Sequence, residues 1–161
     1  MQKVIRVTKG VGTGETRMAA FDAALYAAGI ANYNLVRLSS IIPPGFEVRV
    51  EQCNENDKNF GDRLYVVYAS QVEDEVGKGA WAGIGWVLAQ DGSGKGLFTE
   101  HEAHSEQEVR DLIQKTFTGM VKYRQEKYGP IKYAVSGLTC DGNPVCAFVA
   151  AVYTSVPWSV E

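Results

Sequence analysis

Only two segments of this chain carry a helical pattern, and most of the remainder has the pattern of short strands. Apolar residues recur at helical spacing over residues 16–28 and 105–128. The predicted strands cover residues 3–8, 34–38, 47–51, 63–72, 80–90, 96–102, 131–139 and 145–154. Two helices with many mostly antiparallel strands predict an α+β fold, since a helix can cover one face of each of two packed sheets.

Turn and capping signals set the limits of these elements. Gly29 ends the first helix, and the Ser105-x-x-Glu108 pattern opens the second. Asp-Gly pairs at 91–92 and 141–142 predict two hairpins, the second of which would pair the last two strands with each other. The buried stripe of the second helix is predicted to contain Val109, Leu112, Ile113, Thr116, Phe117 and Met120.

Length and charge narrow the classes of function. A chain of 161 residues is predicted to form a single domain with a full core. Its net charge of −3 argues against nucleic acid or an anionic membrane as the main partner. No run of apolar residues is long enough to predict a membrane-spanning helix. Because the three cysteines follow no signal-peptide pattern, we expect reduced thiols and a cytoplasmic location.

Two further patterns are interpreted as structural. Gly10-x-Gly12-x-Gly14 lies between a strand and a helix, but its spacing matches neither a dinucleotide fingerprint nor a Walker loop, so it predicts a tight turn. His101 and His104 lie three residues apart without a Cys-x-x-Cys partner. We interpret them as solvated polar residues and predict no metal site.

Two carboxylates have more than one interpretation. Asp22 lies among alanines, one position from the buried stripe of the first helix. It is either at the solvent edge of that stripe or at the floor of a pocket that awaits a cation, because a buried carboxylate needs a charged or hydrogen-bonding partner. Glu100 near the end of a predicted strand is either a solvated rim residue or an acid placed over a cleft.

A serine pair, Ser39-Ser40, precedes the rigid Pro43-Pro44 pair. By itself this pattern is typical of a loop. However, a serine hydroxyl held against the preceding carbonyl can attack it in an N→O acyl shift, and the resulting ester can eliminate. Such chemistry needs a strained turn and a donor for the oxyanion.

Several motifs follow one another along nearly the whole chain. They are Gly12-Thr13-Gly14-Glu15-Thr16, Ala20-Phe21-Asp22-Ala23-Ala24-Leu25, Asn32-x-Asn34-Leu35, Arg37-Leu38-Ser39-Ser40-Ile41-Ile42-Pro43-Pro44, Gly96-Leu97-x-x-Glu100-x-Glu102 and Cys146-Ala147-Phe148. Their combination resembles the pyruvoyl-dependent arginine decarboxylases. The Ser-Ser-Ile-Ile-Pro-Pro block with an upstream Phe-Asp carries most of the resemblance.

The resemblance implies a proenzyme that cuts itself between Ser39 and Ser40 with the assistance of Asn34. The products would be a β chain of residues 1–39 and an α chain of residues 40–161, which begins with a covalent pyruvoyl group made from Ser40. The resemblance also implies a four-layer αββα sandwich, assembled as a homotrimer with active sites between subunits.

The implied reaction converts arginine into agmatine and carbon dioxide, for polyamine synthesis or acid resistance. By resemblance, Glu100 donates the proton to the substrate, Asp22 binds its guanidinium group, and the new Ser39 carboxylate lies near its amine. The implied substrate-binding positions are Asp22, Ser39, Leu25, Ala31 and Tyr33. Ala31 is a departure, because archaeal members of the family have glycine there, in a loop that borders the guanidinium pocket.

Two alternatives stay open on the sequence alone. One is the same chemistry acting on another amino acid. The other is a non-catalytic oligomeric binding protein that keeps the bond between Ser39 and Ser40.

Overall fold

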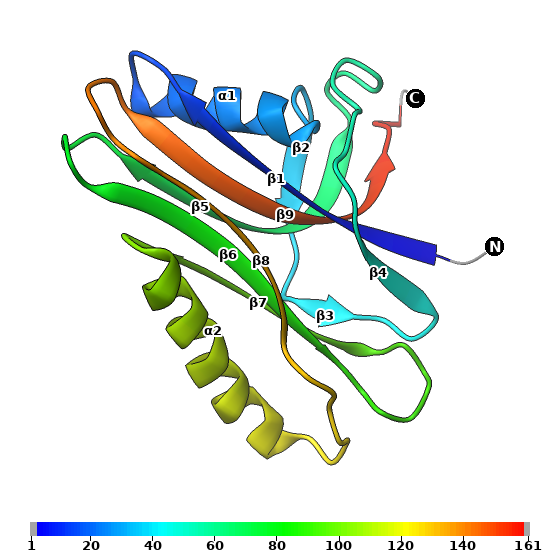
Figure 1. Ribbon diagram of the computed structural model, residues 1–161. Coiled ribbons are helices and arrows are strands. Elements are labelled where there is room, and N and C mark those ends of the chain that lie inside the picture. Colours follow the sequence, from blue (N-terminus) through cyan, green and yellow to red (C-terminus); the bar gives the residue numbers. More distant parts are fainter. Residues whose placement is uncertain (1–2, 160–161) are drawn as a thin grey trace.

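Four layers make up the computed structural model, which describes residues 3–159, with one helix on each outer side of two packed sheets (Figure 1). In chain order the elements are β1 (Lys3–Thr13), α1 (Arg17–Ala28), β2 (Asn34–Arg37), β3 (Ile41–Ile42), β4 (Phe46–Val50), β5 (Arg63–Glu73), β6 (Gly79–Leu88), β7 (Gly96–Ala103), α2 (Glu106–Met120), a 3₁₀ turn (Val121–Tyr123), β8 (Lys132–Thr139) and β9 (Val145–Val156). The predicted α+β class with two main helices is confirmed.

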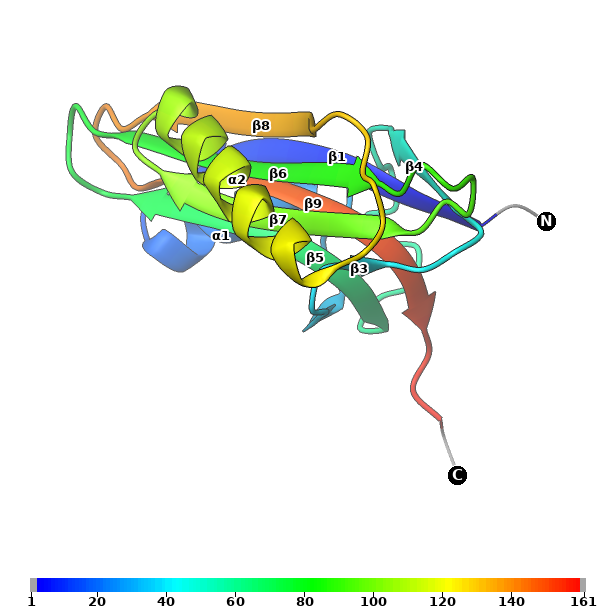
Figure 2. The same ribbon diagram turned by 90° about the horizontal axis from the view of Figure 1, so that it is seen from below.

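The strands form two sheets with different orders. Sheet A has the order β2-β5-β9-β1-β4, and sheet B has the order β3-β7-β6-β8. The β1–β4 and β2–β5 pairs are parallel, and the other pairs are antiparallel. Helix α1 covers the outer face of sheet A, and α2 lies across β6 and β7 on the outer face of sheet B (Figures 1 and 2).

The main core lies between the inner faces of the two sheets. Ile5, Val67 and Val149 from sheet A meet Ile84 and Phe98 from sheet B, and all five side chains are fully buried. Burial of one such side chain stabilises a fold by about 1.5–3 kcal/mol. Side chains alternate between the two faces of a strand. Phe98 of β7 points into this core, so Glu100, two residues later, points toward the same face.

The predicted turn over Gly10–Gly14 is wrong, because β1 continues to Thr13. Gly10 and Gly12 lie directly beneath α1. A Cβ at Gly10 would come within 2.5 Å of the Ala24 carbonyl oxygen, and one at Gly12 within 2.4 Å of the Ala24 nitrogen. Glycine at these positions lets the helix pack closely on the strand. The spacing of the glycines in the sequence does not indicate this role.

The predicted pairing of the last two strands is also wrong. Strand β8 pairs with β6 in sheet B, whereas β9 lies between β5 and β1 in sheet A. The chain therefore crosses from one sheet to the other at the turn near Asp141. The predicted hairpin around Asp91 is confirmed, because β6 and β7 pair antiparallel across it.

Helix α2 is shorter than predicted. Ser105 caps it by accepting a hydrogen bond from the Glu108 amide, but the helix ends at Met120. A bridge between Ala89 and Tyr128 then draws the chain back to the end of β6. Val109, Ile113 and Phe117 are buried as predicted, whereas Leu112 is 37% exposed and lies at the edge of the stripe.

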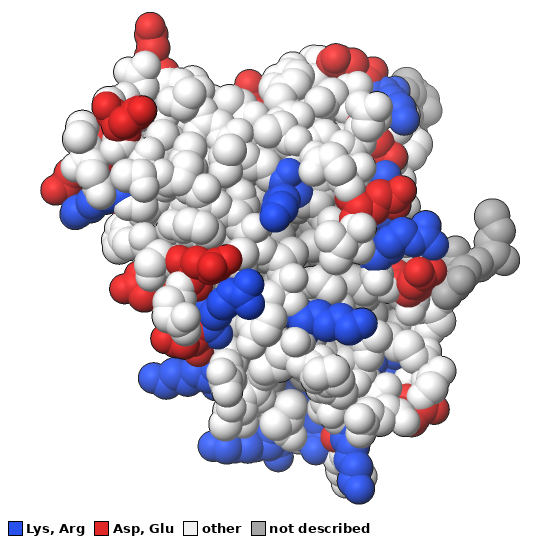
Figure 3. All heavy atoms as spheres, viewed as in Figure 1, with Lys and Arg blue, Asp and Glu red and all other residues white. Residues whose placement is uncertain are grey.

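The surface carries charges of both signs. On the face shown in Figure 3, acidic and basic side chains are interspersed around a broad uncharged area. Among residues 3–159, no helix is long and apolar enough to cross a membrane.

Candidate active site

The Ser39–Ser40 peptide lies where the chain passes from sheet A to sheet B. On the sheet A side, the Leu38 amide donates a hydrogen bond to the Val66 carbonyl at 2.9 Å. On the sheet B side, the Phe98 amide donates to the Ser40 carbonyl, also at 2.9 Å. This peptide is therefore fixed at both ends, by one strand of each sheet. We call the group formed by Ser39, Ser40 and Glu100 the cleavage corner.

The Ser40 backbone has an unusual conformation. Its φ angle is 72°, in the left-handed region that non-glycine residues rarely adopt. A residue held there costs about 1–3 kcal/mol, which the surrounding structure must offset. The strain lies directly at the bond that the sequence predicts to break.

The Ser40 side chain contacts Glu100. Its hydroxyl lies 2.7 Å from Glu100 Oε1 and 2.9 Å from Oε2, so it donates to the carboxylate. Glu100 is half-buried on β7. Burial raises the pKa of Glu100, while the Ser40 hydrogen bond and the positive charge of Arg37 oppose that rise. A raised pKa is the direction that a proton donor requires.

Two residues that the sequence analysis did not single out act on the cleavage corner from nearby, Arg37 through its charge and Tyr153 through the chain next to Ser40. Arg37 lies with its guanidinium 4.3 Å from the Tyr68 ring centroid and donates to the Tyr68 carbonyl at 2.6 Å. Tyr153 donates from its hydroxyl to the Ile41 carbonyl at 2.6 Å. Arg37 belongs to the same motif as Ser39 and Ser40, so the sequence offered a signal for it. Tyr153 lies in an ordinary strand pattern, which gives no signal of a site.

A groove of about 670 Å³ opens beside the cleavage corner. Its lining is mostly apolar and aromatic, and none of the residues that form it is acidic. They are Lys3, Val4, Leu38, Phe46, Tyr65, Tyr153, Thr154 and Val156. A guanidinium group needs an anionic partner when it is taken from water, so this groove alone does not recognise one.

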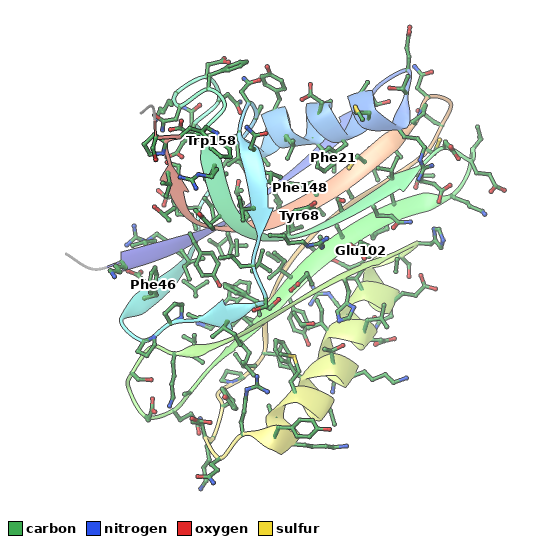
Figure 4. All side chains as sticks on the ribbon, turned by 180° about the vertical axis from the view of Figure 1, so that it is seen from behind. Phe21, Phe46, Tyr68, Glu102, Phe148 and Trp158 are labelled. Atoms are coloured by element: carbon green, nitrogen blue, oxygen red, sulfur yellow. The ribbon has the colours of Figure 1, made fainter. Side chains whose placement is uncertain are left out.

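The predicted substrate-binding residues other than Ser39 gather elsewhere, on the α1 side of sheet A. Leu25 and Ala31 are buried in the core beneath α1, and Tyr33 packs at its margin. That core contains a stack of Phe21, Phe148 and Tyr68 (Figure 4), with Phe21 and Phe148 edge to face at 5.9 Å. We call the outer surface of α1 around Asp22, with Leu25 and Tyr33 beside it, the α1 surface.

Asp22 itself is exposed, one helical turn before Leu25. Glu100 faces the space between the sheets, whereas α1 covers the outer face of sheet A. Sheet A therefore lies between the two carboxylates, and one chain does not bring them together.

Asn34 is also distant from the cleavage corner within one chain. It begins β2 in register with Arg63, and its side-chain amide donates to the Gly61 carbonyl at 2.8 Å. The strand then runs through Arg37 before it reaches Ser40, and each extended residue adds about 3.3 Å. The Asn34 side chain therefore does not contact the Ser39–Ser40 bond of its own chain.

The histidines have structural partners. His101 lies 2.8 Å from the Thr116 hydroxyl of α2 and 3.0 Å from Thr99. His104 lies 3.4 Å from a Glu73 oxygen and contacts the Gly79 carbonyl. Within residues 3–159, no three His, Cys, Asp or Glu side chains are grouped so that they could hold a metal ion.

Comparisons with known proteins identify one family. The family model described as pyruvoyl-dependent arginine decarboxylase matches residues 4–156. A protein of that name from Thermococcus sibiricus is 35% identical over 142 residues, which cover 86% of this chain and 87% of that protein. Another, from Thermoplasma volcanium, is 33% identical over 132 residues, or 74% of this chain and 72% of that protein.

The fold is also similar to a solved structure. Pyruvoyl-dependent histidine decarboxylase at pH 8 superposes with a TM-score of 0.44 and 14% identity, over 58% of this chain and 51% of that one.

Proposed function

This chain belongs to the pyruvoyl-dependent arginine decarboxylase family, and on that premise we propose that it is a self-cleaving enzyme that converts arginine into agmatine and carbon dioxide. It cuts itself between Ser39 and Ser40 into a β chain of residues 1–39 and an α chain of residues 40–161. The observation that carries the proposal is the cleavage corner, where a strained Ser40 donates its hydroxyl to a half-buried Glu100.

Cleavage uses atoms of the chain and one water molecule. Ser40 Oγ attacks the Ser39 carbonyl carbon, the bond from that carbon to the Ser40 nitrogen breaks, and the hydroxyl proton passes to the freed nitrogen. Loss of the Ser40 Cα proton then expels the Ser39 carboxylate from Cβ. Water replaces the nitrogen, which leaves as ammonia, and a ketone remains on residue 40. Glu100 orients the hydroxyl for the first step.

The residues around Ser40 fit the resulting pyruvoyl group. The group supplies a ketone that accepts the substrate amine and the electrons released with carbon dioxide. The Phe98 amide donates to the Ser40 carbonyl, next to the future ketone, where a fixed donor stabilises negative charge. Glu100 lies against the same residue, and burial favours its protonated form. It is therefore suited to deliver a proton to the substrate Cα.

Recognition of the guanidinium group is the part that one chain leaves incomplete. The groove beside the cleavage corner has no acidic lining residue, and Asp22 lies on the other side of sheet A. These placements support an assembly in which a neighbouring copy presents its α1 surface to the cleavage corner, and the family resemblance favours a homotrimer. Asp22 would then pair with the guanidinium through two carboxylate oxygens, and Asn34 would reach the Ser39–Ser40 bond of the neighbouring chain.

Co-expression of two variants tests this arrangement. Asp22→Asn chains keep Glu100, and Glu100→Gln chains keep Asp22. If each site combines residues of two chains, random mixing restores about one quarter of the wild-type sites, although either variant alone is nearly inactive. Mixed assemblies no more active than the single variants contradict a shared site.

A product assay tests the substrate. Purified protein incubated with carboxyl-labelled arginine should release labelled carbon dioxide and form agmatine in equal amounts. Lysine and ornithine, which lack the planar guanidinium, are the controls and should react at least tenfold more slowly, roughly the effect of losing one charged hydrogen bond. A faster reaction with either control assigns the same chemistry to another amino acid.

The state of the three cysteines is relevant to the cellular compartment in which the protein acts. Cys53, Cys140 and Cys146 are all buried and free. Free buried thiols are typical of a reducing compartment, and this supports the cytoplasm as the site of action.

A further inference from the structure

Cleavage changes how residue 40 is held, and the inference that follows rests on the proposed function. In the intact chain, Ser40 is joined covalently through Ser39 to Leu38, which is hydrogen-bonded to sheet A. Once the bond is cut, residue 40 becomes a chain terminus. Strand β3, which follows it, is only two residues long and pairs with β7 through Ile41 and Ile42. A two-residue edge strand gives a new terminus little support.

The Ile41 carbonyl provides a second attachment. Successive backbone groups of a strand point to opposite sides, so the Ser40 carbonyl faces β7 and accepts from Phe98, whereas the Ile41 carbonyl faces away from β7. There it accepts the Tyr153 hydroxyl at 2.6 Å. Tyr153 belongs to β9 of sheet A. Within residues 3–159, this is the one hydrogen bond that links residues 40–42 to sheet A.

The Tyr153 ring is itself held in place. It packs against Phe46 at 6.3 Å and edge to face against Phe98 at 6.2 Å between ring centroids. Phe46 lies at the same end of the sandwich as β3 (Figure 4). Burial, with the nearby charge of Glu100, raises the pKa of Tyr153, so its hydroxyl stays protonated and available as a donor.

We propose that Tyr153 is a positioning residue that ties the pyruvoyl-bearing terminus of the α chain to sheet A after cleavage. Its hydroxyl replaces the covalent link through Ser39 as the attachment to that sheet. By fixing the Ile41 carbonyl, Tyr153 keeps residue 40 against Glu100 and the Phe98 amide during turnover. It does not exchange protons with the substrate.

The test compares Tyr153→Phe with Tyr133→Phe, which removes a hydroxyl from the outer face of sheet B, where Tyr133 packs against the α2 core. Two properties are measured on the processed enzymes: amide hydrogen exchange at Ile42, which pairs with Gly96 of β7, by mass spectrometry, and kcat and KM for arginine. We expect Tyr153→Phe to raise exchange and to lower kcat by roughly threefold to tenfold each, the effect of one hydrogen bond, with KM within about twofold of wild type. Tyr133→Phe should match wild type.

A second background separates positioning from general stabilisation. In Ser40→Ala protein, which stays uncut, the covalent link to sheet A persists, so adding Tyr153→Phe should change exchange at Ile42 by less than about twofold. Three results would each overturn the inference. They are an equal rise in amide exchange in both backgrounds, wild-type exchange and kcat in processed Tyr153→Phe, and failure of Tyr153→Phe to cleave. An uncut or inactive wild type instead overturns the proposed function, and the wild-type control reveals this before any variant is compared.

Discussion

The cleavage corner and the α1 surface differ in how much of their chemistry one chain completes. At the corner, Ser40 already donates to Glu100, and the Phe98 amide already holds the Ser40 carbonyl. On the α1 surface, Asp22 is exposed, and its carboxylate makes no ion pair or side-chain hydrogen bond with residues 3–159. The comparison favours a division in which most groups around the Ser39–Ser40 bond lie within one chain, whereas arginine recognition needs a neighbouring copy.

Burial explains this difference. Glu100 is partly withdrawn from water, so its protonation responds to Ser40 and Arg37. Asp22 in water gains little from any single charged partner, because exposed ion pairs contribute only about 0–1 kcal/mol. Its carboxylate becomes selective for a cation only when another surface covers it. Variants of Glu100 and of Asp22 therefore test the two regions separately.

The largest effect is expected from Glu100→Gln. The variant cannot donate a carboxyl proton to the substrate, and kcat should fall by about 10²–10⁴, the usual contribution of a general acid. Its amide oxygen still accepts the Ser40 hydroxyl, so cleavage should persist. Steady-state kinetics and intact mass measured on one preparation check both statements. Full turnover by the cleaved variant removes Glu100 from its role.

A smaller effect is expected from Asp22→Asn. Loss of the charge should lower kcat/KM for arginine by roughly 10–100-fold, the value of a charged hydrogen-bonded pair, and leave cleavage unchanged. Glu15→Gln, near the start of the same helix, is the matched surface control. Unaltered arginine kinetics in Asp22→Asn, or slow cleavage, would contradict the division between the two regions.

The smallest effect concerns stability and pH. Because burial raises the folded pKa of Glu100 above its ordinary value of 4.5, this carboxyl stabilises the fold at low pH and loses that contribution as the pH rises through the folded pKa. Uncut Ser40→Ala protein should therefore gain about 2 °C in Tm from Glu100→Gln at pH 8, and nothing below pH ~4. Scanning calorimetry across pH measures this. Glu102→Gln, exposed on the same strand, is the control, and a pH-independent difference contradicts the assignment.

Local pattern predicted most elements but not how they pair. The cap at Ser105 and the Gly29 stop with its φ of 80° are short-range features that lie where the sequence indicates. Gly10 and Gly12 were misread because their role depends on α1, which lies outside the local window. The pairing of β8 and β9 failed for a related reason. An Asp-Gly turn does not reveal whether the chain stays in one sheet or crosses to the other.

The candidate site was predicted in the same uneven way. Ser39, Ser40 and Glu100 came from motifs, and the structure brings them together. Their separation from Asp22 and Asn34 depends on sheet A, whose order no motif records. Tyr153 reaches the site through a contact between residues 112 positions apart, which a sequence pattern does not reveal.

Intact-mass analysis of the purified wild-type chain, beside Ser40→Ala, tests the central claim most directly. We expect two wild-type species, residues 1–39 and residues 40–161, the larger with a pyruvoyl terminus that resists Edman degradation. Ser40→Ala should remain a single chain of 161 residues. A wild-type protein that also remains one uncut chain would rule out the pyruvoyl enzyme and leave an oligomeric binding protein as the better interpretation.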